Sequence, residues 1–358
     1  MRRLNIGEIG EQLDKWFRRA MPKHEADDPA TPPEAAALAG DGLFAALLEL
    51  EATEPDDGRT LVICQAQDAG KGEDSCLAVR NGKRVFLGAF DGCGGSGAKV
   101  YSSFGGHTGA WAASRAATLA ARDWFLRDDG GDLADAIDRA LQDCKARQPA
   151  GQLLMGSLSR EFPTTVAAFA MSVDGGEAAF YWCGDSRCYA LDADGLHQIT
   201  ADDAAIRDAM RNLREDAPMT NVACASRPFV LHQAEVKLEK PALIFAATDG
   251  CFGYLPSPMA FERLLLKSMR RASNLRDWKR ALDGAIRAVS GDDYTLTAWI
   301  HGFGDFKRMK KALAGRLAAL ERDYPVEAGE EALFAQWERY RPGYERLLQI
   351  TDSERDET

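Results

Sequence analysis

The amino-acid sequence has no uninterrupted apolar run that approaches the ~20 residues of a membrane-spanning helix. Its first residues carry too many charges to form a secretory signal peptide. It also has fewer basic than acidic side chains. The 44 Lys and Arg residues against 55 Asp and Glu residues give the 358-residue chain a net charge of −11. Such a chain is repelled by phosphodiester backbones and by anionic lipid. We therefore expect a cytoplasmic protein that binds neither nucleic acid nor membranes.

Paired cysteine motifs are also absent. The eight cysteines include no Cys-x-x-Cys pair, and no nearby His-x-x-x-His completes a zinc site. A chain of this length needs no disulfides to stabilise its core. We interpret the cysteines as reduced, mostly buried small hydrophobic residues.

Short strand-like runs dominate the chain from about residue 60 to residue 303. They follow one another too closely for alternating crossover helices, so they predict mainly antiparallel sheets. The runs are Leu61–Ala66, Ser75–Arg80, Val85–Phe90, Thr165–Val173, Ala178–Cys183, Ser186–Leu191, Phe229–Val236, Leu243–Ala247 and Tyr294–Ile300. Helical periodicity appears in two pairs between them: Ala110–Leu126 with Leu133–Arg147, and Met259–Ala272 with Asp277–Val289. The pattern predicts an α+β layered domain.

Both ends of the chain have a helical pattern. Residues 1–58 contain an amphipathic helix, a Pro-rich stretch typical of a linker and an apolar helix near Leu43–Leu50. Residues 304–358 contain two helices with apolar stripes: Leu313, Leu317 and Leu320, then Leu333, Phe334 and Trp337. We therefore divide the chain into an N-terminal segment 1–58, a central domain 59–303 and a C-terminal helical extension 304–358. We expect the terminal stripes to pack against the central domain, with partner docking as the alternative.

Acidic residues stand at the ends of several predicted strands. Asp91, Asp185 and Asp249 each follow a strand, while the pairs Glu73-Asp74 and Asp292-Asp293 each precede one. A single Asp-Gly after a strand is typical of a turn. Antiparallel strands can bring several ends to one edge of a sheet, however, and carboxylates gathered there repel one another unless cations neutralise them. Such hard oxygen ligands favour magnesium or manganese.

Seven short motifs follow one another over about residues 60–303. They are Glu73-Asp74-Ser75, Phe90-Asp91-Gly92-Cys93-Gly94-Gly95, Thr164-Thr165, Gly184-Asp185-Ser186-Arg187, Gln198-Ile199-Thr200, Thr248-Asp249-Gly250 and Asp292-Asp293-Tyr294-Thr295. One Asp-Gly-x-Gly-Gly alone is a weak signal, but the ordered series resembles the metal-dependent PP2C (PPM) protein phosphatases, as a divergent, bacterial-type member. The resemblance implies an α-β-β-α sandwich with two central antiparallel sheets, to which this chain adds N- and C-terminal helical extensions.

The resemblance also implies an enzyme that hydrolyses phosphoserine and phosphothreonine in proteins by a metal-activated water. It implies two Mn²⁺ or Mg²⁺ ions, a phosphoprotein substrate and a cognate Ser/Thr kinase pathway. Asp91 would bridge both ions and the Gly92 carbonyl would bind one of them, while Asp249 and Asp292 would complete the second. The remaining ligands implied are Glu73 and Asp74, directly or through water, and Asp185 near a third, weaker ion. Thr165 and Thr200 would support the core and turns.

Several positions depart from the family pattern. The family usually has a phosphate-binding arginine a few residues before the Glu-Asp pair, and this chain has Lys71 in that segment. Lys71 either contacts substrate phosphate or is a solvated surface lysine. Cys93 replaces a histidine, and because Lys99 stands where the Cys-x5-Arg loop of thiol phosphatases has its arginine, we expect a packed thiol rather than a nucleophile. Gly253 replaces an aspartate of the third metal site. Asp202-Asp203 replaces an Asp-His pair, which predicts an altered flap on the substrate side.

An insertion at residues 96–109 follows Asp91 directly. Its Gly, Ser and Thr content predicts a mobile loop, and we hypothesise that it gates or selects the substrate. His107 in this segment could touch the substrate or act as a general acid. The alternative is a histidine that only leads into the following helix.

A second reading of the whole chain is a pseudophosphatase, a signalling or binding module with little turnover. The absent arginine, histidine and third-metal aspartate favour it. Retention of Asp91, Gly92, Asp249 and Asp292 favours the enzyme, because a module without metals has no need to hold mutually repelling carboxylates together.

Overall fold

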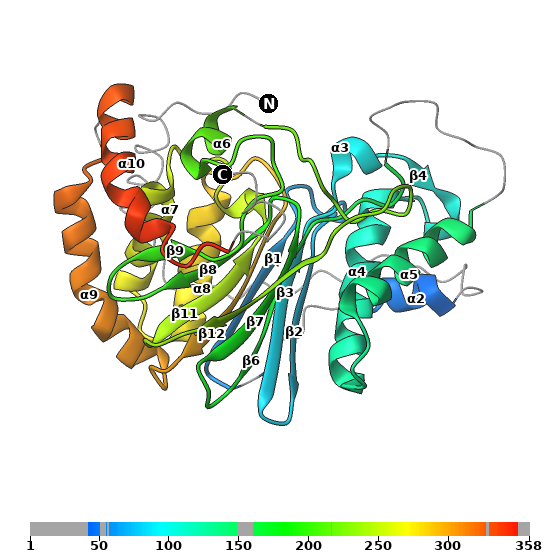
Figure 1. Ribbon diagram of the computed structural model, residues 1–358, viewed down its shortest axis with the longest axis horizontal. Helices are drawn as coiled ribbons and strands as arrows, with labels where there is room; N and C mark the ends of the chain where they lie inside the picture. Colours follow the sequence, from blue (N-terminus) through cyan, green and yellow to red (C-terminus); the bar gives the residue numbers. More distant parts are fainter. Residues whose placement is uncertain are drawn as a thin grey trace, which may run out of the picture.

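Two five-stranded antiparallel sheets form the centre of the molecule (Figure 1). The computed structural model describes residues 42–50, 55, 57–148, 160–215, 217–326 and 329–349. The first sheet has the order β1 (Thr60–Gln65), β12 (Tyr294–His301), β11 (Ala242–Ala247), β8 (Arg187–Leu191) and β9 (Leu196–Gln198). The second has the order β10 (His232–Lys237), β7 (Glu177–Cys183), β6 (Val166–Ser172), β3 (Arg84–Phe90) and β2 (Ser75–Asn81).

All nine predicted strand runs are strands of these sheets, although the one predicted from Phe229 begins at His232. Alternation along each strand separates two cores. In β11, Ile244 and Ala246 face the opposite sheet, while Phe245 and Ala247 face the helices outside. The short strand β9 was not predicted, because three residues are too few to show a period of two.

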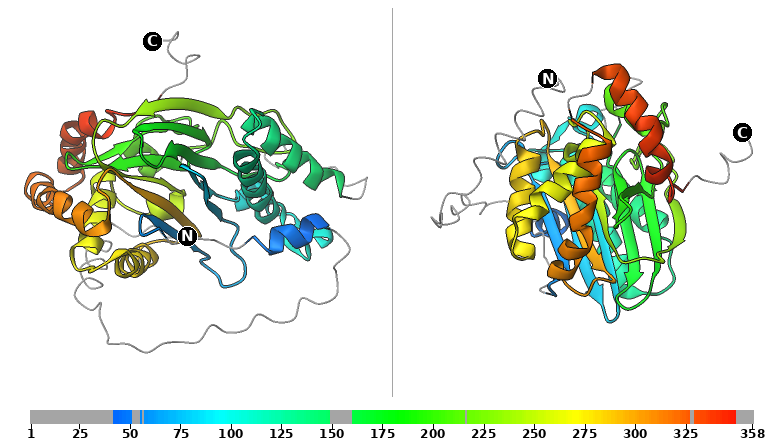
Figure 2. Two further views of the ribbon diagram at one scale, coloured as in Figure 1. Left: turned by 90° about the horizontal axis from the view of Figure 1, so that it is seen from below. Right: turned by 90° about the vertical axis from the view of Figure 1, so that its left-hand side faces the viewer.

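Helices cover the outer face of each sheet, which confirms the predicted α-β-β-α sandwich. On the second sheet lie α4 (Gly109–Arg127) and α5 (Leu133–Ala146), with the short α2 (Gly42–Leu48) against α4. On the first lie α7 (Pro258–Arg270) and α8 (Leu275–Arg287). Figures 1 and 2 show the two helix layers on opposite sides of the sheets. Within the described part of the chain, no helix combines the length and apolar character needed to cross a membrane.

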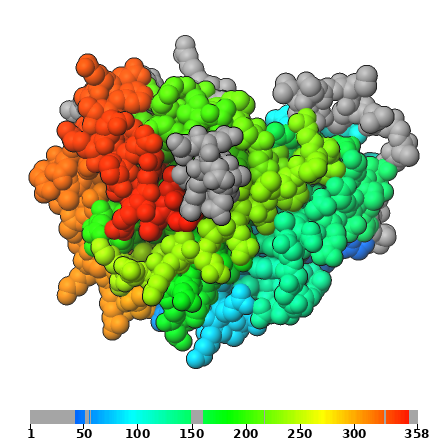
Figure 3. Space-filling view, viewed as in Figure 1, coloured from blue at the N-terminus to red at the C-terminus, as the bar shows by residue number. Residues whose placement is uncertain are grey.

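The C-terminal helices α9 (Phe306–Asp323) and α10 (Glu330–Tyr344) extend the core of the first sheet and form one flank of the molecule (Figure 3). The predicted stripe residues Leu313, Leu317, Leu320, Leu333 and Trp337 are buried there. The extension therefore packs against the central domain, as expected from its stripes. A further short helix, α6 (Ala209–Glu215), follows β9 and was not predicted.

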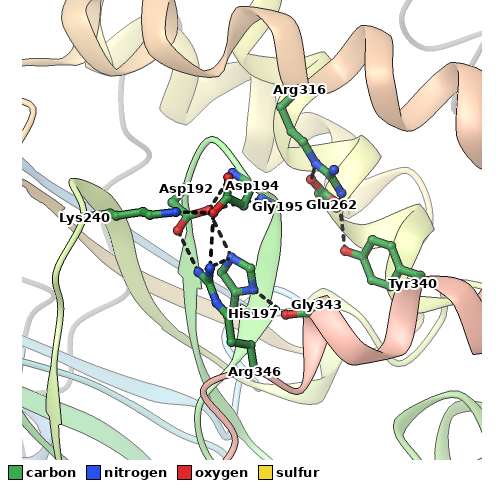
Figure 4. A network of polar contacts seen from close by, with 10 residues as sticks. All are labelled: Asp192, Asp194, Gly195, His197, Lys240, Glu262, Arg316, Tyr340, Gly343 and Arg346. Carbon is green, nitrogen blue, oxygen red and sulfur yellow. Dashed lines mark hydrogen bonds and ion pairs between the residues drawn. The ribbon is translucent and has the colours of Figure 1, made fainter.

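Buried charges fix this extension in place (Figure 4). Glu262 of α7 is fully buried and accepts hydrogen bonds from Arg316 at 2.5 and 2.9 Å and from Tyr340 at 2.7 Å. Just after α10, Arg346 donates to Asp192 at 2.9 Å, and Asp192 also lies 3.0 Å from His197. The amphipathic helix and Pro-rich linker predicted in residues 1–41 lie outside the described residues, and the predicted helix near Leu43 corresponds to α2.

Candidate metal centre

Asp91 lies at the end of β3, where two threonines hold its backbone. The Asp91 carbonyl oxygen accepts hydrogen bonds from the Thr165 amide and the Thr164 hydroxyl, both at 2.8 Å. Gly92 follows Asp91 and lies between the backbones of Glu73 and Ala110. A Cβ atom at Gly92 would lie 2.7 Å from the carbonyl oxygens of both residues. Only glycine allows this approach. The predicted metal-bridging residue is thus held in place by Thr164 and by Thr165, the latter predicted to have a supporting role.

Glu73 and Asp74 enter the same edge from the segment before β2. The Glu73 carboxylate accepts a short hydrogen bond from Thr108, the residue that caps the N-terminus of α4, and the Glu73 amide donates to the Asp293 carboxylate at 2.6 Å. Asp74 is 4% exposed and accepts a hydrogen bond from Thr248 at 2.9 Å. Thr248 in turn directly precedes Asp249, so these contacts join three of the motifs.

Asp185 lies in the turn between β7 and β8, and this turn is fixed on both sides. The Gly184 amide donates to Asp203 at 2.9 Å, and Arg187 forms two hydrogen bonds with Asp202. Ser186 is hydrogen-bonded to Thr165 at 2.7 Å, which ties the turn to the end of β3. The Asp202-Asp203 pair therefore holds the turn that carries Asp185. The altered flap predicted for this pair stays a prediction.

Asp249 and Asp292 come from neighbouring strands of the first sheet. Asp249 follows β11, and Asp292 precedes β12, which pairs with β11. Gly250 is required at this junction, because a Cβ atom would overlap the carbonyl oxygen of Asp293. A Cβ atom at Gly253 would lie 2.9 Å from the Asp249 carbonyl oxygen, so the backbone there leaves little room for an aspartate.

The carboxylates form one electrostatically coupled group. The pKa of Asp91 is held well above its ordinary value by burial and then by the negative charges of Asp74, Asp249, Asp185 and Asp292. Burial, reinforced by Asp249, raises the pKa of Asp185 to about 8. Burial also raises the pKa of Glu73 and of Asp292. The structure thus brings the predicted carboxylates close enough for each charge to oppose its neighbours.

The chemistry of this group fits a divalent cation. Its donors are carboxylate oxygens, and Oδ1 of Asp185 is buried without any hydrogen-bond partner in the structure. A cation would satisfy this oxygen and remove the repulsion. Across the described residues, however, no three Asp, Glu, His or Cys side chains are arranged so that they could hold a metal ion as they stand. The group therefore contains the oxygen ligands that a divalent cation prefers, but its side chains are not arranged as a closed metal site.

The two predicted substrate contacts lie in different environments. Lys71 is 78% exposed on the loop before Glu73, where its ammonium group lies 3.8 Å from the Asp68 carboxylate. His107 stacks on Trp111 with ring centroids 3.9 Å apart. Burial and the neighbouring Arg115 lower the pKa of His107, so it is neutral at pH 7.

The insertion is not the open loop that its composition predicted. It forms α3 (Gly94–Gly97), β4 (Val100–Tyr101), the 3-10 turn η1 (Ser102–Phe104) and β5 (His107–Thr108), with β4 and β5 paired. Tyr101 is 5% exposed and Phe104 is 1% exposed. Both pack against Phe162, with Tyr101 stacked on it at 4.8 Å. The buried contacts of these two aromatic residues hold the hairpin against the domain, despite its Gly and Ser content.

Sequence reasoning missed two residues of this region. Arg115 on α4 donates to the Gly72 carbonyl at 3.3 Å and lies over the Trp111 ring, which places a cation beside Glu73. Asp293 accepts the amides of Gln67 and Glu73 and so fixes the Glu73 segment. The sequence could have indicated Arg115, because it lies one helical turn after Trp111, whereas no local feature distinguishes Asp293 from Asp292.

Burial raises the pKa of Cys93 well above its ordinary value, as expected for a packed thiol.

A model of the family described as Protein phosphatase 2C matches residues 66–287, which is more than half of the chain. The chain belongs to the protein phosphatase 2C family. Membership of this family classes it as a protein phosphatase, a phosphoric monoester hydrolase, and the resemblance shown by its motifs is confirmed. None of the curated protein sequences matches it significantly.

Solved structures share the PP2C fold at low sequence identity. Stp1, a serine/threonine phosphatase from Staphylococcus aureus, is 17% identical with a TM-score of 0.51, and the match covers 70% of this chain and 96% of Stp1. A bacterial serine phosphatase is 17% identical with a TM-score of 0.50, over 68% of this chain and 97% of its own. The Mycobacterium tuberculosis phosphatase PstP/Ppp is 18% identical with a TM-score of 0.49, over 68% and 98%.

Proposed function

We propose that this PP2C member hydrolyses phosphoserine and phosphothreonine in proteins, and that it depends on two bound Mn²⁺ or Mg²⁺ ions. The observation that carries the proposal is the coupled carboxylate group around Asp91, which includes the unpartnered oxygen of Asp185. Family membership supports the reaction class. Stp1 from Staphylococcus aureus, which shares this fold, is a serine/threonine phosphatase, and this supports the substrate class proposed for this chain.

Each ligand has a proposed part. Asp91 would bridge the ions, and the Gly92 carbonyl would bind one of them. Asp249 and Asp292 would bind the second. Further oxygen ligands, directly or through water, would be Glu73 and Asp74, with Asp185 toward a third, weaker ion. When bound, the ions supply a water of lowered pKa and offset the charge of the phosphoryl group.

The chain itself has three tasks in this reaction. The backbone contacts of Thr164 and Thr165 hold Asp91 at a fixed place, and the Asp202–Arg187 pair does the same for the Asp185 turn. Lys71 is exposed beside Asp68 and would attract a phosphate dianion as a point charge. His107 would contact the substrate as a neutral hydrogen-bonding group. Phosphoproteins made by a cognate Ser/Thr kinase would be the substrates.

Hydrolysis of p-nitrophenyl phosphate tests the proposal. The wild type is compared in EDTA, Mg²⁺ and Mn²⁺ with Asp91→Ala, Asp249→Ala and Asp174→Ala. Asp174 is the control, because it is an exposed aspartate just beyond β6, at the end opposite Thr165. We expect metal-dependent turnover that both site variants lose by at least a hundredfold and that the control keeps. A wild type no faster than Asp91→Ala in saturating Mn²⁺ would contradict the enzyme.

A phosphopeptide assay tests the pseudophosphatase alternative. That reading gains one structural argument, since the carboxylates are not arranged as a closed metal site among the described residues. A pseudophosphatase would bind a phosphopeptide in Mn²⁺ without releasing phosphate. Release of phosphate from a phosphothreonine peptide at a rate proportional to enzyme concentration would exclude it.

A further inference from the structure

His232 joins the two sheets beside the turn that carries Asp185. It is the first residue of β10, at the edge of the second sheet, where it pairs with Trp182 of β7. Its Nε2 atom lies 2.8 Å from the carboxylate of Asp203, in the segment that follows β9 at the edge of the first sheet. Because a carboxylate accepts hydrogen bonds, Nε2 carries the hydrogen and donates it. The contact therefore links two segments that lie 29 positions apart.

The surroundings of the His232 ring point to a polar role for it. The ring packs on Trp182 with ring centroids 5.1 Å apart, and its side chain is 12% exposed. Nδ1 of His232 is buried and has no hydrogen-bond partner among the described residues. An unsatisfied buried nitrogen destabilises the fold, so packing alone does not explain a histidine here. The hydrogen bond to Asp203 does explain it.

Asp203 transmits this contact to the turn. Its Oδ2 atom accepts the Gly184 amide at 2.9 Å, and its own amide donates to the Gly184 carbonyl, also at 2.9 Å. Asn221 donates to the same Oδ2 atom at 2.7 Å, whereas His232 holds the other oxygen, Oδ1. Because both oxygens are held, the carboxylate cannot rotate away from Gly184 without breaking a hydrogen bond.

The conformation of Gly184 sets the direction of Asp185. Gly184 has a φ of +97°, and a Cβ atom there would lie 2.8 Å from Cγ2 of Thr165. This left-handed conformation favours glycine and needs its hydrogen bonds to persist. Asp185 is the next residue, and its buried Oδ1 atom has no hydrogen-bond partner among the described residues. The backbone that Asp203 holds therefore places the oxygen that a cation would satisfy.

We propose that His232 is a positioning residue of the metal centre, which holds Asp203 and, through Gly184, keeps the unpartnered oxygen of Asp185 in place for a divalent cation. This role rests on the proposed function, because it concerns the ion that Asp185 would bind. His232 acts only through Asp203 and takes no part in the chemical step. Loss of a residue that orients a metal ligand typically weakens metal binding by about 10–100-fold.

Calorimetric titration of the metal-free full chain with Mn²⁺ tests this role without any turnover. Asp185→Ala identifies the binding step that involves Asp185, because that step is lost. His232→Phe keeps an aromatic ring beside Trp182 and removes the donor, so the same step should become roughly tenfold weaker. His232→Gln offers an amide N–H at the reach of Nε2 and should bind Mn²⁺ as the wild type does.

His301→Phe is the matched control for the titration. His301 also has a buried Nδ1 atom without a hydrogen-bond partner among the described residues, and it lies at the end of β12 that is away from Asp292. The same substitution there should leave Mn²⁺ binding unchanged. A loss in His301→Phe equal to that in His232→Phe would overturn the inference.

His232→Asn is the second variant, which answers the question even where His232→Phe does not fold. Its amide reaches only as far as Nδ1, so it should weaken Mn²⁺ binding although it is polar. Wild-type affinity in His232→Asn, or an equal loss in His232→Gln, would overturn the inference. In saturating Mn²⁺ the KM for p-nitrophenyl phosphate should stay unchanged in His232→Asn, and a rise in KM without weaker Mn²⁺ binding would also overturn it.

The titration separates this inference from the proposed function. A wild type that binds no Mn²⁺ would refute both. A wild type that binds Mn²⁺ and hydrolyses phosphate esters, with every folded His232 variant binding Mn²⁺ equally well, would refute the positioning role and leave the proposed function standing.

Discussion

The guanidinium of Arg187 donates to both carboxylate oxygens of Asp202, at 2.7 and 2.6 Å, and the two side chains are 2% and 4% exposed. Asn212 adds a third hydrogen bond to Asp202 at 2.7 Å. The ring of Phe252 lies beneath the guanidinium at 4.4 Å. A buried two-point ion pair of this kind fixes the direction of the strand that follows Asp185.

Replacing one partner of this pair should destabilise the fold. Asp202→Asn leaves the Arg187 charge buried without a counter-charge, which costs about 3–5 kcal/mol of the free energy of unfolding. Urea denaturation at pH 7 measures the loss. The control is Glu215→Gln, which breaks the exposed pair with Arg211 and should produce no measurable change. A loss no larger than that of the control would show that the buried pair does not hold the turn.

Acid should weaken the anchor of the C-terminal extension. Burial disfavours the charged form of Asp192, but His197 and Arg346 outweigh burial and lower the pKa from 3.8 to about 2. Because the folded pKa is depressed, the stabilisation is complete above pH 4 and is lost as the pH falls toward 2. The difference in unfolding free energy between wild type and Asp192→Asn should be roughly 2 kcal/mol at pH 6 and shrink toward zero near pH 2. A difference that is independent of pH would contradict this assignment.

Asp185 should have the opposite pH dependence in metal-free protein. Its pKa is raised to about 8, so the fold favours the neutral acid, and stability is lost as the pH rises from about 4 through 8. In EDTA at pH 8.5, Asp185→Asn should therefore melt at a higher temperature than the wild type. Adding Mn²⁺ should raise the melting temperature of the wild type more than that of the variant. A variant that melts lower than the wild type in EDTA would count against the repulsive group.

The C-terminal extension should be inseparable from the domain. Trp337 of α10 is 1% exposed and lies in the core of the first sheet, so Trp337→Ala should lower the unfolding free energy by about 3–5 kcal/mol. Val326→Ala, at a residue that is 39% exposed, is the matched control. Removal of residues 305–358 should give insoluble protein. A soluble, active truncation would favour partner docking instead.

The substrate contacts predict different kinetic signatures. Lys71→Ala should raise KM for a phosphopeptide several-fold with little change in kcat, because an exposed point charge attracts the dianion before chemistry. Lys83→Ala is the control, an exposed lysine in the turn between β2 and β3. An equal rise in KM for Lys71→Ala and Lys83→Ala would remove Lys71 from the substrate site.

His107→Ala should leave the pH dependence of kcat unchanged, since a histidine neutral at pH 7 is a poor general acid.

The sequence alone determined the strands, the paired helices and the family. Alternation and helical periodicity are local, so the runs around Val85–Phe90 and Leu243–Ala247 could be recognised without knowing their neighbours. The motif series named the carboxylates from Glu73 to Asp292. Local composition failed in the insertion, where glycine and serine predicted a mobile loop. The buried contacts of Tyr101 and Phe104 with Phe162 decided otherwise.

Only the tertiary structure decided which residues hold the carboxylates. Asp203 reaches Gly184 across 19 positions, Asp293 reaches Glu73 across 220, and no sequence pattern links either pair. Each contact depends on the path of the chain between distant segments, and that path is set by packing of the whole domain. The local sequence pattern therefore identifies the carboxylates, and only the long-range packing determines which residues form hydrogen bonds that hold them in place.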